Sequence, residues 1–266
     1  MARVRARESS RPDRLFDDPY AAAFAAAGPE DVTPRGADAS ADGRPSRAAL
    51  AFQIVIRTRF FDDFVLAAAG AGCHQVVLLA AGLDTRAFRL EWPAGVHAFE
   101  LDLPAVLAFK EAVLGSARAE PTCRRSTLAI DLREDWPARL IQCGFEPGRR
   151  TAWLAEGLLV YLEPGDAAAL LSRIGQLSAT GSRLAFELGA VGRRLAGAGV
   201  TIAQDSDPVL SLWRGGLDDD APLWLGRNGW EAVAHDLGSV AASYGRPASV
   251  ETHSGFVTAT RTVVGW

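Results

Sequence analysis

The pattern of apolar and polar positions predicts strands that alternate with helices along most of the chain. The clearest strand is Val76–Ala80, five apolar residues in a row, and such a run is typical of a central strand buried on both faces. Shorter apolar stretches predict four more strands, at 96–102, 126–130, 151–155 and 183–188. Helical patterns follow the first four strands. The chain is therefore predicted to be α/β, with a doubly wound, mostly parallel sheet.

The N-terminal part of the chain shows a different pattern. Residues 1–12 are polar and are expected to be frayed, whereas Arg14–Ala27 has a helical composition. The stretch 28–45 is rich in proline and glycine and is predicted to be a mobile loop. We interpret 1–45 as an N-terminal helical lid.

The remainder, 46–266, is predicted to form one main domain. It begins with a long helix to about Ala69, for which Ser46 is a candidate cap. An irregular, charged insertion around 189–225 is interpreted as a second lid segment. After it, 228–243 is predicted to be helical, and 254–264 alternates as a last strand.

Composition and charge argue against several classes of function. A net charge of −4 provides no general attraction to nucleic acid or to an anionic membrane. Cys73, Cys123 and Cys143 lack the spacing of metal ligands, so we interpret them as free thiols and expect no metal site. With no membrane-length apolar run and no apolar signal core, the protein is predicted to be cytoplasmic.

The turn after the first strand indicates a nucleotide site. Ala80-Ala81-Gly82 separates that strand from Asp84-Thr85, which can cap a following helix. Asp102 lies 20 residues beyond Gly82, the distance at which an acid usually holds a ribose hydroxyl. One glycine is weak evidence by itself, because the dinucleotide fingerprint needs three.

Three acids at strand ends strengthen this interpretation. Asp102, Asp131 and Glu156 each lie at or just past the carboxyl end of a predicted strand, the edge at which open α/β sheets bind ligands. Together they suit a ligand that is rich in hydroxyls and amines and carries positive charge. A nucleoside with a sulfonium fits this description, whereas a pyrophosphate would be repelled.

At this point the chain resembles the leucine carboxyl methyltransferase family, which comprises S-adenosylmethionine-dependent class I O-methyltransferases with a Rossmann-like sheet. The resemblance extends in order over nearly the whole chain. The motifs that carry it are RPDRLFDDPYA (Arg11–Ala21), IRTRFFDDF (Ile56–Phe64), VVLLAAGLDTRAFRL (Val76–Leu90), FELDLPAV (Phe99–Val106), DLREDW (Asp131–Trp136), EGLLVYL (Glu156–Leu162), Gly229-Trp230 and YGRP (Tyr244–Pro247).

The resemblance implies a role for individual residues toward S-adenosylmethionine. Arg57 would bind the methionyl carboxylate in preference to Arg59, although two such arginines taken alone are typical of a solvated helix face. Ala80 and Gly82 would let the backbone approach the cofactor, and Ala80 replaces a frequent glycine of the family.

The remaining roles fall on the strand ends. Asp102 would take the ribose hydroxyls, with Glu100 nearby, and Asp131 with Leu132 would hold the adenine. Glu156 would face the methionine end, and Glu156 and Tyr161 would position the reactants.

The acceptor is the least determined part of the function. We favour a small-molecule carboxylate, such as an aromatic polyketide acid, over a hydroxyl, because an ionised acid needs no general base and none of the four histidines follows the third, fourth or fifth strand closely. Candidate pocket residues are aromatic: Phe16, Tyr20, Phe24, Trp213 and Trp224. Two alternatives remain open, a nicotinamide-dependent oxidoreductase and a non-catalytic regulator that binds S-adenosylmethionine. The oligomeric state is left open.

Overall fold

The fold is that of a computed structural model of the chain, which describes residues 1–28, 47–188, 214, 216–217, 220–247 and 255–262. Several predicted features lie outside these residues. They are the loop from residue 29, the cap at Ser46, most of the insertion at 189–225, Trp213 and His253.

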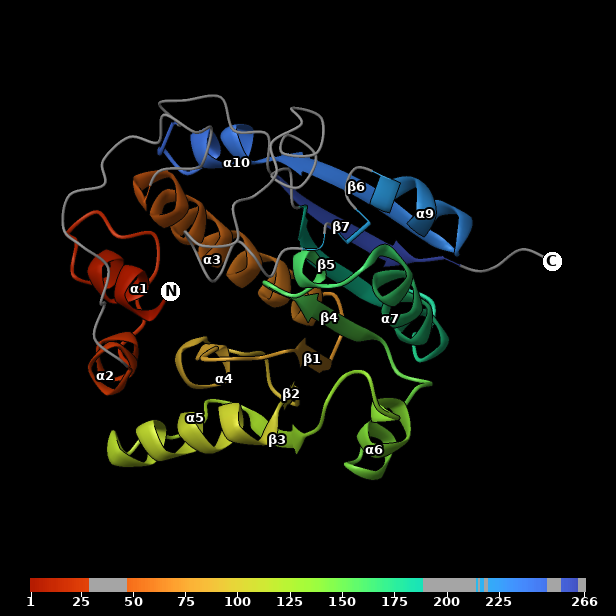
Figure 1. The fold of residues 1–266 in the computed structure, drawn as a ribbon, viewed down its shortest axis with the longest axis horizontal. Helices are drawn as coiled ribbons and strands as arrows, with labels where there is room; N and C mark the ends of the chain where they lie inside the picture. The colour runs from red at the N-terminus through yellow and green to blue at the C-terminus, as the bar shows by residue number, and fades with distance from the viewer. Residues whose placement is uncertain (29–46, 189–213, 215, 218–219, 248–254, 263–266) are drawn as a thin grey trace.

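The centre of the fold is one sheet of seven strands in the order β3-β2-β1-β4-β5-β7-β6 (Figure 1). Strands β1 to β5 are parallel to one another, whereas β7 lies antiparallel between β5 and β6. The bounds are β1 Gln75–Leu79, β2 His97–Asp102, β3 Arg124–Ala129, β4 Thr151–Ala155, β5 Arg183–Leu188, β6 Trp230–Asp236 and β7 Gly255–Arg261. The predicted α/β fold with a doubly wound, mostly parallel sheet is confirmed.

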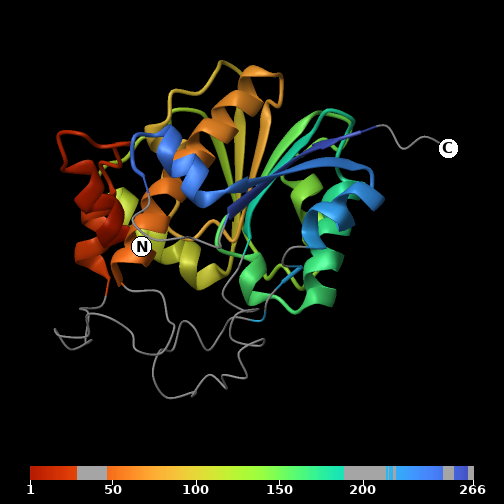
Figure 2. The ribbon, with the colours of Figure 1, turned by 90° about the horizontal axis from the view of Figure 1, so that it is seen from above.

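Helices cover both faces of this sheet (Figures 1 and 2). One face carries α6 (Trp136–Gln142), α7 (Pro164–Gln176) and α9 (Ala221–Arg227). The opposite face carries α1 (Ala2–Ser9), α2 (Ala21–Ala27), α3 (Arg47–Gly70), α4 (Arg86–Arg89), α5 (Pro104–Ser116) and α10 (Leu237–Ser243). A short 3-10 helix, η1 (Leu159–Tyr161), follows β4.

The buried run in β1 shows how the strands feed both layers. Val77 and Leu79 pack in the core under α6 and α7, whereas Val76 and Leu78 pack in the core under α3. Successive side chains of a strand point to opposite faces, so a central strand with helices on both sides is apolar at every position. This is why β1 and β4 were predictable as continuous apolar runs.

The helix predicted over Arg14–Ala27 forms only over Ala21–Ala27, and two other predicted elements are wrong. Residues 1–12 are not frayed, since they contain α1, whose Ala2 packs with Phe24 of α2 and Phe88 of α4. Residues 228–243 are not one helix, because β6 occupies 230–236 before α10 begins. Strand β6 is an edge strand with one paired neighbour, and its Val233 is exposed, so its apolar residues do not follow the alternation of a half-buried strand.

A buried ion pair joins β2 to α5. Lys110 of α5 and Glu100 of β2 are both 0% exposed, and Lys110 Nζ lies 2.7 Å from Glu100 Oε2. Arg125 of β3 donates to the same carboxylate oxygen, also at 2.7 Å. Glu100 therefore binds two cations between the sheet and α5. It is not available to assist Asp102 with ribose hydroxyls, the role suggested for it from the sequence.

Candidate cofactor-binding site

The carboxyl ends of the parallel strands bring the predicted site residues to one edge of the sheet. In register, Leu79 of β1 lies beside Leu101 of β2, and Asp102 lies beside Ala129 of β3. Glu156 follows β4, which pairs with β1 on its other side. The strand order reverses between β1 and β4, and such a switch point is where open α/β sheets bind ligands.

The turn after β1 brings Gly82 against Asp102. The Gly82 N–H donates to Asp102 Oδ2 at 2.6 Å, and the Leu103 N–H donates to Asp102 Oδ1 at 2.7 Å. Asp102 is 8% exposed, and a carboxylate has about four lone-pair sites, so two backbone donors leave acceptors for hydroxyl groups.

Ala80 adopts the left-handed conformation that the turn requires. Its φ is +50°, the same as that of Gly82. A residue with a Cβ costs roughly 1–2 kcal/mol in this conformation, whereas glycine adopts it freely. Replacement of the family's frequent glycine by alanine therefore leaves the backbone path of the turn intact at a cost in strain.

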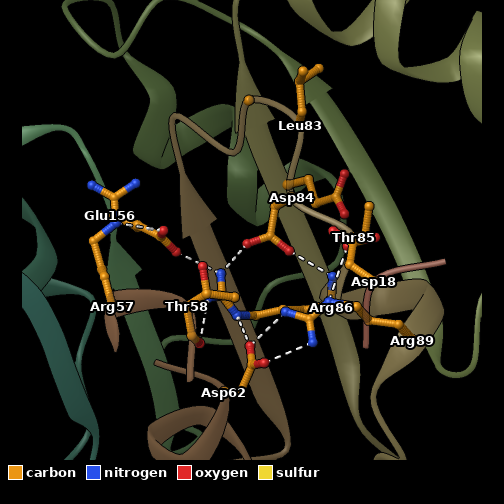
Figure 3. A network of polar contacts seen from close by, with 12 residues as sticks. Asp18, Arg57, Thr58, Asp62, Leu83, Asp84, Thr85, Arg86, Arg89 and Glu156 are labelled. Carbon is orange, nitrogen blue, oxygen red and sulfur yellow. Dashed lines mark hydrogen bonds and ion pairs between the residues drawn. The ribbon is translucent and has the colours of Figure 1, made fainter. Parts of the chain in front are cut away.

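Arg57 and Glu156 meet behind this turn. Arg57 Nε donates to Glu156 Oε1 at 2.8 Å, and Arg57 is 8% exposed although it lies on the long helix α3 (Figure 3). The expectation of a solvated helix face is thus wrong for Arg57. Arg59 fits the expectation of a solvated helix face better. Its side chain is 40% exposed and pairs with Asp63, one turn along the helix, at 3.0 Å.

Glu156 also binds a second arginine that the sequence did not single out. Arg86 Nη1 donates to Glu156 Oε2 at 2.8 Å and also contacts Asp84, and Arg86 Nε donates to Asp62 at 2.7 Å. Arg89 closes the set with a bidentate contact to Asp62, both distances being 2.7 Å. We call these six residues the arginine–carboxylate cluster: Arg57, Asp62, Asp84, Arg86, Arg89 and Glu156.

The cluster keeps Asp84 and Glu156 ionised. Burial opposes the charge of Asp84, but Arg86 and further cations outweigh it and hold the pKa of Asp84 at about 2. Burial likewise opposes the charge of Glu156, yet Arg86 and Arg57 lower its pKa. An ionised Glu156, with its side chain 18% exposed, can therefore accept a hydrogen bond from a cationic ligand at this edge.

Two signals in the sequence pointed toward this cluster without identifying it. Asp84 was considered only as a helix cap, and its Oδ1 does accept the Arg86 N–H at 2.7 Å. Asp62 lies in the FFDDF motif of the long helix, within one helical turn of Arg59. Nothing in the local pattern shows that Arg86 and Asp62 meet, because their contact depends on how α3 packs against the turn after β1.

Asp131 and Leu132 lie just past β3, outside the cluster. Asp131 accepts hydrogen bonds from Arg133, and this contact lowers the pKa of Asp131 to about 2. Leu132 is half-buried against the core under α6. Tyr161 of η1 is 36% exposed. The roles proposed for these three residues remain predictions.

The described histidines lie away from the junction of β1 and β4. His97 begins β2, at the opposite edge as expected, and burial lowers its pKa to about 4 with help from Arg124. His74 directly precedes β1. His235 was expected in a helix but lies on β6, where its Nε2 is 2.8 Å from Thr258 Oγ1. It is at the carboxyl edge of the sheet, in register with Phe256 of β7, which in turn pairs with Glu187 of β5.

The N-terminal segment contacts the turn directly. Arg5 of α1 donates to the Leu83 carbonyl at 2.6 Å and pairs with Asp18. The aromatic candidates for a pocket are packed nearby or in the core. Tyr20 stacks edge-on against Phe88, Phe16 lies under Arg89, and Phe24 is 1% exposed. Trp224 is part of α9 and packs, partly buried, against the core that this helix covers.

The described residues offer neither a metal site nor a membrane-spanning helix. No group of three or more histidine, cysteine or acidic side chains is placed to hold a metal within the ranges that the structure describes. Over the same residues, no helix combines the length and the apolar character needed to cross a membrane.

The strand order, with β7 antiparallel beside β5 and polar groups at the carboxyl edge, defines the fold of class I methyltransferases. A similar solved structure is magnesium protoporphyrin IX methyltransferase from Synechocystis PCC 6803 with bound S-adenosylhomocysteine. Its TM-score is 0.52 and its identity 15%, over 83% of this chain and 90% of that one. The CurJ carbon methyltransferase matches with a TM-score of 0.52 and 16% identity, over 80% of this chain and 55% of the other.

The family follows from the sequence comparisons. The leucine carboxyl methyltransferase profile matches residues 1–175. A Frankia alni protein is 48% identical over 98% of this chain and 92% of its own, and a Streptomyces coelicolor protein is 47% identical over 94% and 87%. Both are named, provisionally, as S-adenosyl-L-methionine-dependent methyltransferases. This chain belongs to the leucine carboxyl methyltransferase family, as its motifs predicted.

Proposed function

We propose that the protein transfers a methyl group from S-adenosylmethionine to a carboxylate oxygen of a small molecule, such as an aromatic polyketide acid. Methyl transfer from S-adenosylmethionine follows from the family and the fold. The carboxylate acceptor and the small-molecule substrate are the parts that we add. The observation that carries the proposal is the meeting of Arg57 and Glu156 behind the Gly82 turn, at the switch point of the sheet.

The residues present suit the cofactor. Arg57 has five N–H donors. One donor on Nε binds Glu156, one on Nη1 binds Glu187 and one on Nη2 lies 3.0 Å from the Met1 sulfur, so two donors remain for a methionyl carboxylate. Asp102 keeps acceptors for ribose hydroxyls beside Gly82, which carries no side chain to obstruct a ligand. Asp131 and Leu132 supply an acceptor and an apolar surface for adenine.

When bound, the cofactor supplies an electrophilic methyl group on a sulfonium. The protein's contribution is to bind and align the two reactants and to exclude water. A carboxylic acid is already ionised at neutral pH, so its oxygen needs no deprotonation, whereas a phenol with a pKa near 10 would usually require a base. His74 and His97 lie at the opposite edge of the sheet, and His235, two strands beyond β5, has its Nε2 2.8 Å from Thr258 Oγ1. This placement supports an acceptor of the first kind.

The expected product is a methyl ester. Protein incubated with S-adenosylmethionine and an extract of its own organism should give a product heavier by one CH₂, and mild alkali should release methanol from it. With both substrates saturating, kcat should stay nearly constant from about pH 6 to 9, because the acceptor does not titrate there. Mass spectrometry and a pH series measure both.

Other outcomes would point elsewhere. An alkali-stable methyl ether, formed at a rate that falls in His235→Ala, would contradict the ester and the base-free mechanism. Cofactor binding with no turnover across a broad panel of acids would favour the non-catalytic regulator instead.

A further inference from the structure

A fourth strand-end acid, Glu187, joins the site from β5. It lies one residue before the end of that strand and is 6% exposed. Its Oε1 accepts a hydrogen bond from Arg57 Nη1 at 3.0 Å. Its Oε2 is buried and has no hydrogen-bond partner among the residues that the structure describes. Such an oxygen is costly to bury unless something binds it.

Glu187 and Glu156 hold Arg57 from two sides. Arg57 Nε is bound by Glu156 and Arg57 Nη1 by Glu187, so one guanidinium joins the ends of β4 and β5. Gly157 follows Glu156, and a Cβ built there would lie 3.8 Å from both Glu187 Oε1 and Arg57 Nη1. The carboxylate and the guanidinium therefore lie side by side next to a residue that has no side chain.

The charges of the side chains that pair in this region do not balance. The arginine–carboxylate cluster holds three arginines and three acids, and Glu187 adds a further acid to the ion pairs. Among these seven side chains, one carboxylate is thus in excess. Burial raises the pKa of Glu187, and Glu156 raises it further, although Arg57 acts against both. A bound cation would compensate this excess.

We propose that Glu187 binds the α-ammonium group of the methionyl part of the cofactor through Oε2, while Arg57 binds the carboxylate on the same carbon. This inference rests on the proposed function and adds a binding residue to it. An α-amino acid carries an ammonium and a carboxylate next to each other, and adjacent carboxylate and guanidinium groups form its complement.

The test compares two ligands that differ only in the amine. Calorimetry would use S-adenosylhomocysteine and its desamino analogue, 5′-S-(3-carboxypropyl)-5′-thioadenosine. The wild-type protein should bind the amine-bearing ligand about tenfold or more tightly. In Glu187→Gln this preference should shrink to roughly twofold, mainly because S-adenosylhomocysteine binds more weakly.

Controls separate the possible roles. Glu163→Gln, an exposed acid just before α7, should keep the full preference for the amine. Glu187→Asp, which retains the charge but shortens the side chain, should lose part of it, and thermal melts would check that each variant is folded. An equal loss for both ligands in Glu187→Gln would mean that Glu187 only positions Arg57, and a preference abolished by Glu156→Gln instead would assign the ammonium to Glu156. Either result overturns the proposal. A wild-type protein that binds neither ligand would contradict the proposed function itself.

Discussion

Replacing Arg57 with alanine is expected to weaken binding of S-adenosylhomocysteine by about tenfold to about a hundredfold. A charge-assisted contact between a guanidinium and a carboxylate, shielded from water, contributes roughly 1.5–3 kcal/mol. Arg57 is 8% exposed and is held in place by Glu156 and Glu187, so its remaining donors are preorganised toward a ligand. Calorimetric titration of the two proteins measures the change.

Arg59→Ala is the matched control for this prediction. Arg59 lies on the same helix, but its side chain is 40% exposed and its ion pair with Asp63 is local. We expect its loss to change affinity by less than about threefold, since exposed pairs contribute little. Arg57→Lys should fall between the two, because lysine keeps the charge but lacks the planar fork. Equal affinities of Arg57→Ala and Arg59→Ala would show that the assignment of the carboxylate to Arg57 is wrong.

Replacing Lys110 with alanine should lower the free energy of unfolding by about 3–5 kcal/mol. Lys110 and Glu100 are both fully buried, and removing one partner leaves an uncompensated charge inside the protein. Arg125 also pairs with Glu100 and moderates the loss without abolishing it. Urea denaturation of the wild-type and variant proteins would measure the change.

Two further variants show whether the charge is the cause. The double substitution Lys110→Met with Glu100→Leu should recover part of the lost stability, because a buried pair can often be replaced by apolar groups of similar size. Arg125 loses Glu100 in this variant but keeps its ion pair with Glu111. Arg139→Ala, which removes an exposed cation from helix α6, should stay within about 0.5 kcal/mol of the wild type. If Lys110→Ala were as mild as Arg139→Ala, the buried pair would not stabilise the fold.

The sequence predicted those parts of the fold whose residue pattern is compatible with only one kind of structure. Val76–Ala80 is apolar at every position because β1 is covered on both faces, and Asp102 lies where a strand meets the ligand edge. Helix α1 was missed because its sequence, ARVRARES, has no apolar stripe and is held by contacts such as that of Arg5 with Leu83. Propensity and periodicity carry no information about such tertiary contacts.

The sequence identified some residues of the site and missed others. The strand-end acids were found by one rule, and the same rule applied to β5 would have found Glu187 in the stretch FEL. Arg86 and Asp62 were not recognised, because their ion pair forms only when α3 lies across the turn after β1. The positive φ of Ala80 could not be predicted from the sequence either, because alanine does not indicate a left-handed conformation as glycine does.

The most direct test is calorimetry of the purified wild-type protein with S-adenosylmethionine, S-adenosylhomocysteine and NADH in separate titrations. We expect binding heat with the two adenosyl ligands at roughly a hundred micromolar or below, and none with NADH. The Gly82 turn, Asp102 and the Arg57–Glu156 pair suit a cationic nucleoside and not a pyrophosphate. No heat with either adenosyl ligand, together with clear binding of NADH, would contradict the assignment of this site.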